Sequence, residues 1–300
     1  MKISISSSIS NFRDKLLKRT GFQEYNPKKD KYENCLFVGL YHSKDFRKFI
    51  FHRGKKEVFW CGSDCLINIH RNSIIPWKLL LRFPKARHIC ENEIEQKALL
   101  EIGIKAEIYP SFFDNPEDFP ISFEPSDFPH VFLTCHGGKE PEFAARQSGL
   151  DIIEKIASKI PEITFHIYGR KKPFHQVWQD FTDYGFSGSS KVPTGRIYNL
   201  EYATNPNVIY HGEVSNEIFN KEIRNYHAAI RLHKLNGFGE TIAKSILLGQ
   251  YPISRIPYPH ISYAPDEETF ISLLRNLKYK REPNPNRDYW YNLLKNFPSW

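Results

Sequence analysis

Two glycine-rich stretches in the second half of the chain carry residue types that bind phosphate groups. Residues 136–139 read His-Gly-Gly-Lys, and residues 236–241 read Asn-Gly-Phe-Gly-Glu-Thr. Glycines let a ligand approach backbone N–H groups, and a lysine supplies charge that suits a departing diphosphate. Each stretch alone also fits an ordinary turn. Placed at the ends of strands, they predict a site for a nucleotide or a nucleotide-sugar.

The elements around these stretches would place them at one edge of a sheet. Apolar runs at 130–134 and 163–168 predict strands, and residues 207–254 predict a strand–helix–strand–helix–strand unit with parallel strands. A doubly wound α/β sheet has this alternation. Further strands are predicted at 36–41, 56–60, 86–91 and 106–109, and helices at 45–53, 92–102 and 143–160.

Two segments carry no pattern that we assign. Residues 1–30 match no element. Residues 171–205 are rich in Gly, Ser, Pro and aromatic residues, and they predict either an active-site loop or a small irregular insertion.

Residues 207–254 resemble the C-terminal half of group 1 GT-B glycosyltransferases. That pattern has a strand, Gly-x-Val-Ser and a helix, then a strand, an acidic residue, Gly-Phe-Gly, and a helix with a second acidic residue before Gly-x-Pro-Val. The spacing matches, but Asn236 and Lys244 stand at the two acidic positions. The resemblance implies an α/β protein of GT-B architecture, with two Rossmann-like domains whose parallel sheets face a central cleft.

The resemblance also implies where the donor binds. The first acidic position usually meets the donor sugar and the second the ribose. Asn236 can still bond a sugar hydroxyl, whereas Lys244 can only donate. Glu240 either replaces part of the lost carboxylate function, as a catalytic group, or stabilises a helix start. The predicted donor-binding residues are His136, Gly138, Lys139, Arg170, Gly212, Glu213, Val214, Arg231, His233, Asn236, Gly237, Phe238, Gly239, Thr241 and Lys244.

We expect the residues that bind the acceptor, here called the acceptor side, in the first domain. Residues 60–64, Trp-Cys-Gly-Ser-Asp, resemble a Trp-x-Gly-Ser/Thr-Asp turn of some bacterial glycosyltransferases of this type. Asp64 follows a predicted strand, so it either accepts the acceptor's proton as a catalytic base or caps the next segment. Gly62, Ser63 and His42 are predicted to lie on the same side.

The chain length suits two domains, because one core usually takes about 100 to 150 residues. We predict an acceptor-side domain at 1–120, with a helix at 286–300 packing back onto it, and a nucleotide-sugar domain at 126–285. The prolines of residues 111–129 predict the linker. The five cysteines show no zinc spacing and are expected to be reduced thiols in a cytoplasmic protein.

Charge is concentrated near the N-terminus. Residues 1–110 hold 21 Lys and Arg against 12 Asp and Glu, whereas the other 190 residues hold 21 against 22. This excess of positive charge predicts that the acceptor, or the surface on which the N-terminal part docks, is anionic. The alternative is a lysine-rich face that only contacts solvent. Basic and apolar residues alternate at 71–87, which suits peripheral contact with an anionic membrane or an ordinary packed helix.

The predicted function is transfer of a sugar from a nucleotide-sugar donor to an acceptor hydroxyl of a glycan or a lipid-linked glycan. No metal and no other cofactor is expected, because basic groups and helix N-termini would stabilise the leaving diphosphate. Two alternatives stay open. The missing carboxylates favour a non-catalytic nucleotide-sugar-binding partner subunit, and the basic N-terminal part favours an enzyme that glycosylates nucleic acid.

Overall fold

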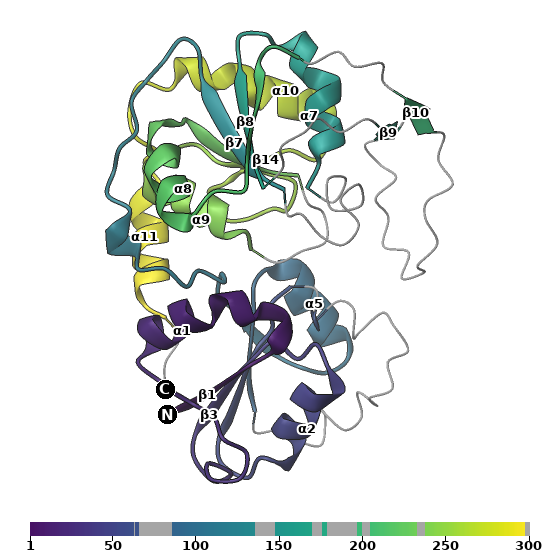
Figure 1. Ribbon diagram of the computed structural model, residues 1–300, viewed down its shortest axis with the longest axis vertical. Coiled ribbons are helices and arrows are strands. Elements are labelled where there is room, and N and C mark those ends of the chain that lie inside the picture. Colours follow the sequence, from purple (N-terminus) through teal and green to yellow (C-terminus); the bar gives the residue numbers. More distant parts are fainter. Residues whose placement is uncertain are drawn as a thin grey trace. The chain divides into compact units, whose positions relative to one another are not determined.

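The computed structural model describes residues 1–62, 64–65, 86–135, 148–169, 205–232 and 238–297, and the backbone of two short strands at 176–178 and 197–199. The chain forms two compact units, drawn in Figure 1. The first unit comprises Met1–Asn115, Leu235–Glu240 and Leu293–Trp300, and the second comprises Pro116–Lys234 and Thr241–Asn292. In the described part of the chain, no helix has the length and apolar character that crossing a membrane requires.

The first unit is built on a parallel sheet of six described strands. Their spatial order is β2-β1-β3-β4-β5-β6, and each neighbouring pair is parallel. The order changes direction between β1 and β3, and in such sheets ligands bind beyond the carboxyl ends of the strands at that point. The strands are β1 (Lys2–Ile5), β2 (Gln23–Glu24), β3 (Cys35–Val38), β4 (Lys56–Phe59), β5 (Arg87–Cys90) and β6 (Ala106–Ile108).

Both faces of this sheet are covered. Side chains alternate between faces along a strand. Phe37 of β3 packs with Phe49 of α2 (Ser43–Phe51) in one apolar cluster that also takes in Leu99 of α5 (Glu93–Glu101). Its neighbour Leu36 belongs to a second cluster, with Leu16 of α1 (Arg13–Thr20). A short 3₁₀ helix, η1 (Ser7–Phe12), joins β1 to α1.

The N-terminal segment is where the sequence was least informative. Residues 1–30 matched no predicted element, yet β1 lies in the sheet with β2 on one side and β3 on the other. Its Ile3 is fully buried, and its Ser4 is buried as well. A strand covered on both faces is usually a continuous apolar run. Because Ile and Ser alternate in β1, the sequence did not predict this strand.

The second unit has a parallel sheet with order β11-β8-β7-β12-β13-β14. Counted from its first strand, this is the 3-2-1-4-5-6 order of dinucleotide-binding domains, with the direction changing between β7 and β12. The strands are β7 (His130–Thr134), β8 (Thr164–Tyr168), β11 (Val208–Gly212), β12 (Ala228–Arg231), β13 (Ile253–Ser254) and β14 (Ser262–Tyr263).

The predicted unit at 207–254 contains β11, α8 (Asn216–Glu222), β12, α9 (Glu240–Leu247) and β13 in that order. Its strands are not all neighbours, because the connection from β11 to β12 crosses β8 and β7. The remaining described helical segments of this unit are η2 (Pro116–Asp118), α7 (Leu150–Ile156), η3 (Ala157–Lys159), η4 (Ile223–Asn225), α10 (Glu267–Asn276), η5 (Leu277–Tyr279) and the start of α11 (Arg287–Lys295). Within 171–205, β9 (Gln176–Trp178) pairs antiparallel with β10 (Ile197–Asn199).

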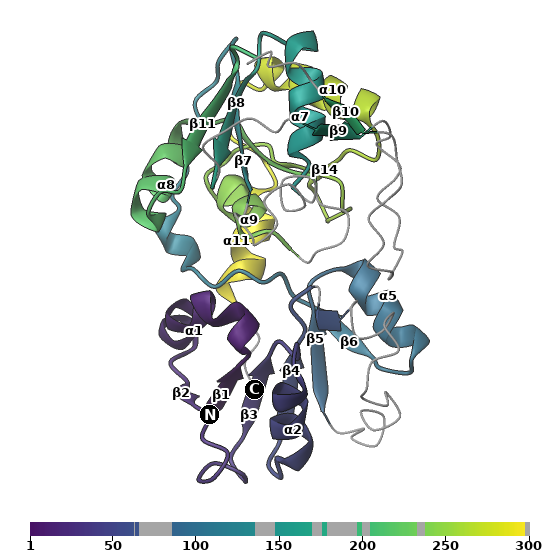
Figure 2. The ribbon, with the colours of Figure 1, turned by 45° about the vertical axis from the view of Figure 1, so that its right-hand side comes forward.

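The two faces of the second sheet differ in chemistry. On one face, Val131 and Phe165 join an apolar cluster with Ile153 of α7 and Leu274 of α10. Figure 2 shows β11, β8 and β7 side by side, with α8 next to them. On the α8 side the strands carry histidines and aromatic residues instead, and Phe132 packs edge-on against Phe219 of α8.

One buried amide fixes the start of β11. Nδ2 of Asn207 donates to three carbonyl oxygens, those of Ala157 (3.0 Å), Ile160 (3.2 Å) and Ile163 (2.9 Å). These carbonyls lie between α7 and β8, so a single side chain ties that connection to the entrance of β11. Only a donor suits this position, because all three partners are acceptors.

We therefore expect Asn207→Asp to lower the free energy of unfolding by about 3 kcal/mol or more, since it sets a carboxylate against three carbonyl oxygens. Denaturant unfolding at neutral pH measures the loss. Asn216→Asp, at an exposed first position of α8, is the matched control and should change stability by less than about 0.5 kcal/mol. Equal stability of the two variants would contradict the importance of the three bonds.

Candidate functional site

Several predicted site residues lie outside the described part of the chain, and their roles stay predictions. The same holds for residues 71–85 of the predicted membrane-contact segment 71–87. The residues concerned are Ser63, His136, Gly138, Lys139, Arg170, His233, Asn236 and Gly237.

The loops at the carboxyl edge of the second sheet approach one another through their backbones. The N–H of Gly169, after β8, donates to the carbonyl of Gly212, at the end of β11, over 2.6 Å. A Cβ on Gly169 would lie 2.1 Å from the carbonyl oxygen of Cys135, and both glycines have positive φ. No other residue fits at Gly169 without displacing the backbone. The end of β11, where the turn begins, is thus joined to the end of β8 by a main-chain hydrogen bond.

The predicted donor-binding residues after β11 and β12 have different exposures. Glu213 is exposed and Val214 is half-buried, whereas Ser215 caps α8 by accepting from the N–H of Ile218 over 3.2 Å. Arg231, at the end of β12, and Thr241, in the first turn of α9, are half-buried. Phe238 and Gly239 are buried, and the carbonyl of Phe238 accepts from Ser111 Oγ.

Lys244 is almost completely buried inside the second unit. Its Nζ donates to Asn220 Oδ1 of α8 over 2.9 Å and lies 5.6 and 5.5 Å from the ring centroids of Phe119 and Phe219. An ammonium over two aromatic faces is stabilised by their quadrupoles, more so when water is excluded. This charge links α9 to α8. Its predicted contact with the nucleotide stays a prediction.

Glu240 is engaged in an ion-pair cluster of the first unit. Lys15 Nζ of α1 lies 2.7 Å from Glu240 Oε1 and 3.0 Å from Asp114 Oδ2. Burial works to lower the pKa of Lys15, but the two carboxylates together raise it. One lysine thus neutralises part of the charge of two acids. The predicted catalytic role of Glu240 would require its carboxylate to exchange Lys15 for another partner.

Asp64 is fully buried, and both its oxygens accept backbone hydrogen bonds. Oδ2 accepts from the N–H of Leu40 (2.8 Å), and Oδ1 accepts from those of Cys61 (2.7 Å) and Cys65 (2.8 Å). Burial raises the pKa of Asp64 to about 6, although these bonds work in the opposite direction. The carboxylate links the turn after β3 to the turn after β4, which suits the structural alternative. Gly62 lies in the second of these turns and has positive φ.

An exposed Ser–His pair lies where the strand order of the first sheet reverses. Ser8 Oγ and His42 Nε2 are 2.8 Å apart, and both residues are exposed. Asp45 Oδ2 accepts from the His42 backbone N–H (3.0 Å) and from Ser6 Oγ (2.7 Å), so it ties the turn after β1 to the turn after β3. The sequence analysis predicted His42 on the acceptor side but did not predict Ser6 or Ser8, because β1 before them was not assigned.

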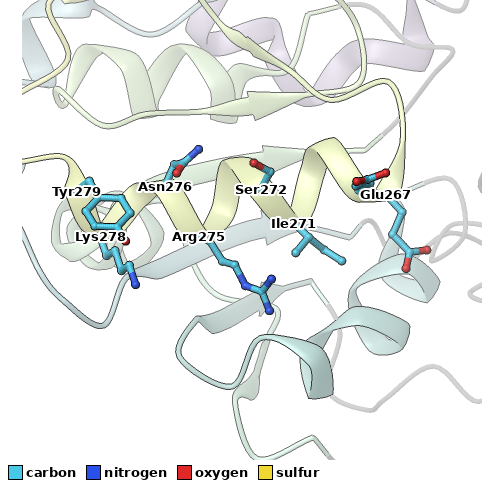
Figure 3. A pocket seen from close by; sticks show the side chains of 8 residues that line it. Glu267, Ile271, Ser272, Arg275, Asn276, Lys278 and Tyr279 are labelled. Atoms are coloured by element: carbon cyan, nitrogen blue, oxygen red, sulfur yellow. The ribbon is translucent and has the colours of Figure 1, made fainter.

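A groove of about 700 Å³ runs along α10 and η5, shown in Figure 3. Glu267, Ile271, Arg275 and Tyr279 are among the side chains that line it, and none of its lining residues is a predicted site residue. The groove therefore adds nothing to the candidate site.

No family model and no curated protein sequence matches this chain. Solved structures do match. Sucrose-phosphate synthase from Thermosynechococcus elongatus is 13% identical, with 90% of this chain and 71% of that chain covered and a TM-score of 0.57. For WaaB, a lipopolysaccharide outer core galactosyltransferase in its apo form, the identity is 12%, the coverages are 98% and 95%, and the TM-score is 0.55.

TarM is 12% identical with a TM-score of 0.51, and the match covers 87% of this chain but only 51% of TarM, so the chain spans about half of TarM's length. These matched proteins are glycosyltransferases of the GT-B class. At such low identity the likeness defines the fold. The protein has the GT-B fold, and the architecture predicted from the sequence is confirmed in its two doubly wound parallel sheets.

Asp64→Asn should lower the free energy of unfolding at pH 7.5 by about 1 to 3 kcal/mol, because the amide NH₂ must face at least one buried backbone N–H whichever way it turns. Thermal or denaturant unfolding measures the change. The control is Asp14→Asn on the exposed side of α1, which should be nearly neutral. Unchanged stability of Asp64→Asn would mean that the three bonds contribute little, and it would strengthen the predicted role as acceptor base.

Proposed function

We propose that this protein is a metal-independent glycosyltransferase that moves a sugar from a nucleotide-sugar donor to an acceptor hydroxyl of a glycan or a lipid-linked glycan. The observation that carries the proposal is the GT-B fold, with a second sheet in the 3-2-1-4-5-6 strand order. The matched galactosyltransferase and synthase structures support transfer chemistry in general. We place the protein in the cytoplasm, with peripheral membrane contact through 71–87 as part of the proposal.

The donor would bind at the carboxyl edge of the second sheet. Support comes from the turn after β11, where Gly212 meets Gly169 backbone to backbone and Glu213 is exposed. The backbone of the exposed Glu213 would meet the nucleotide base, as the sequence analysis predicts. Lys139, outside the described residues, would meet the diphosphate with Arg170 as the sequence analysis predicts.

The acceptor hydroxyl would bind at the Ser8–His42 pair. The acceptor oxygen would form a bond to the anomeric carbon as the bond from that carbon to the diphosphate oxygen breaks. The acceptor proton would pass to His42 Nε2, either directly or through the Ser8 hydroxyl, which gives its own proton to Nε2 and takes the acceptor's. Exposure of both side chains and their 2.8 Å separation support this arrangement.

Donor binding is tested by a thermal-shift screen of the intact protein with UDP, GDP, ADP and their sugars. A nucleotide at 100 times its Kd should stabilise the protein by about 2.7 kcal/mol. Lys139→Ala should weaken binding of that nucleotide by about 1.5 to 3 kcal/mol in calorimetry, because it removes a hydrogen bond to a charged group. The absence of any shift with all these ligands would overturn the proposed function.

The acceptor role is tested by His42→Gln and Ser8→Ala, with Ser7→Ala as the matched exposed control. Once a donor is known, we expect His42→Gln to slow transfer by about a hundredfold or more, and Ser8→Ala to slow it less. Nucleotide affinity should not change, and Ser7→Ala should behave as the parent. Transfer at the parent rate in His42→Gln would remove this pair from the acceptor site.

Two observations favour other functions, and both functions can be tested together with glycosyl transfer. Lys244 and Glu240 are both bound to protein partners, which suits a nucleotide-sugar-binding subunit that does no chemistry. A parent protein that binds a nucleotide-sugar yet neither transfers nor hydrolyses it would support that function. The basic residues of the first 110 favour a nucleic acid acceptor, and salt-dependent binding of a DNA or RNA duplex would support it.

A further inference from the structure

Three histidines on neighbouring strands of the second sheet form a continuous hydrogen-bonded ladder. His130 of β7, His166 of β8 and His211 of β11 all lie on the α8 side of the sheet. His130 Nδ1 is 2.8 Å from His166 Nε2, and His166 Nδ1 is 2.9 Å from His211 Nε2. Successive rings are 5.1 Å apart at both steps. The middle ring, His166, is buried, whereas the two outer rings are partly exposed.

The ladder ends at a carboxylate on α8. His211 Nδ1 lies 3.7 Å from Glu222 Oε2. The same carboxylate oxygen accepts from Tyr168 Oη over 2.6 Å, and Tyr168 Oη is 2.6 Å from Tyr226 Oη. The Tyr168 ring also stacks on His211, with centroids 4.4 Å apart. Glu222 is therefore approached by two polar arms, one through the histidines and one through Tyr168.

The order of donors in the ladder follows from its carboxylate end. A neutral imidazole has one donor nitrogen and one acceptor nitrogen. If each histidine carries its proton on Nδ1, then His130 donates to His166, His166 donates to His211, and His211 points its proton at Glu222. All three rings then share one tautomer. A second proton on His166 or His211 would bring two N–H groups against each other at one of the steps.

The ladder and the Tyr168–Glu222 bond join both ends of the turn between β11 and α8 to β8. Residue 212 follows His211 directly, and residues 213–215 lead into α8, which ends at Glu222. One end of the turn is joined to β8 through His211 and His166. The other end is joined to β8 through α8, where Glu222 accepts from Tyr168 and Phe219 packs edge-on against the Tyr168 ring at 4.9 Å.

We propose that His166 and Tyr168 are positioning residues, which hold the 213–215 turn in place for the nucleotide and release it in acid. The nucleotide part rests on the proposed function, whereas the holding of the turn does not. His166 would touch no substrate and would act through His211. The regulated event is opening of the turn after β11.

The direction of the pH effect follows from burial. Burial, and then the neighbouring His130 and His211, lower the pKa of His166 to about 3, and burial also lowers the pKa of His130. Once the turn opens, His166 would titrate near the usual value of about 6.5. The open form therefore binds a proton that the closed form excludes. The closed form keeps its full stability above about pH 6.5 and loses it as the pH falls from there toward 3.

The groups that face His166 come from every element packed against it. They are His130 of β7, His211 of β11, Tyr168 of β8, Tyr226 before β12 and Glu222 of α8. Burial raises the pKa of Tyr168 and of Tyr226, so neither phenol ionises between pH 3 and 7. His227 adjoins His130 at the far end, and burial lowers its pKa too.

Hydrogen exchange of the intact protein tests the proposal without any ligand. The amides of Ile218 and Phe219 report the turn, because they donate to the side chain and the carbonyl of Ser215. We expect them to exchange about tenfold faster or more in His166→Phe than in the parent at pH 7, while amides of β12 stay unchanged. In the parent, protection of these two amides should fall about tenfold or more between pH 7 and pH 5, after correction for intrinsic rates, and in His166→Phe it should not change with pH.

His130→Gln is the matched control, because it alters the ladder at the end away from the turn, and its protection of the Ile218 and Phe219 amides should stay within about threefold of the parent. If His166→Phe does not fold, Tyr168→Phe takes its place and should speed exchange over 218–222. Parent-like protection of these amides in a folded His166→Phe, or in Tyr168→Phe, overturns the proposal. Failure of the parent to bind UDP, GDP or ADP overturns the proposed function only.

Discussion

Burial of parallel strands on both faces is the constraint on which this structure depends. Helices cover both sides of each sheet, so a polar group within a strand or at its end has little access to water and needs a partner inside the protein. Asp64 meets this demand with three backbone N–H groups, and Asn207 meets it with three carbonyl oxygens. The histidines of the second sheet meet it by bonding to one another.

The same constraint explains what the sequence could predict. Apolar runs that end in glycine mark buried parallel strands, and β11, β12 and β13 appear in the predicted order. The pattern predicted a doubly wound sheet, and the resemblance of 207–254 to group 1 enzymes implied the GT-B fold. β1 was not predicted, because its serines interrupt the apolar run, although Ser4 is buried together with Ile3. With β1 unassigned, nothing pointed to Ser6 and Ser8.

Side-chain partners were beyond the reach of the sequence, because they come from distant positions. Glu240 bonds to Lys15, 225 positions away, and no local pattern joins these residues. His130, His166 and His211 are each unremarkable in a strand, and only the sheet order puts them in a row. At Lys244 the sequence predicted a cation in place of an acid, and the structure adds that Asn220 and two aromatic rings surround it.

The first unit is assembled from both ends of the chain. Arg19 of α1 and the Tyr109 hydroxyl both donate to the carbonyl of Leu294, and the Phe297 ring lies over Phe59. A ribosome releases Arg19 long before Leu294 exists, so during synthesis the first unit must wait with part of its apolar surface uncovered until residues 293–297 emerge. The second unit has all its strands by residue 263, but α10 and the residues up to 292 still have to join it. Synthesis of the first unit thus begins before that of the second and ends after it.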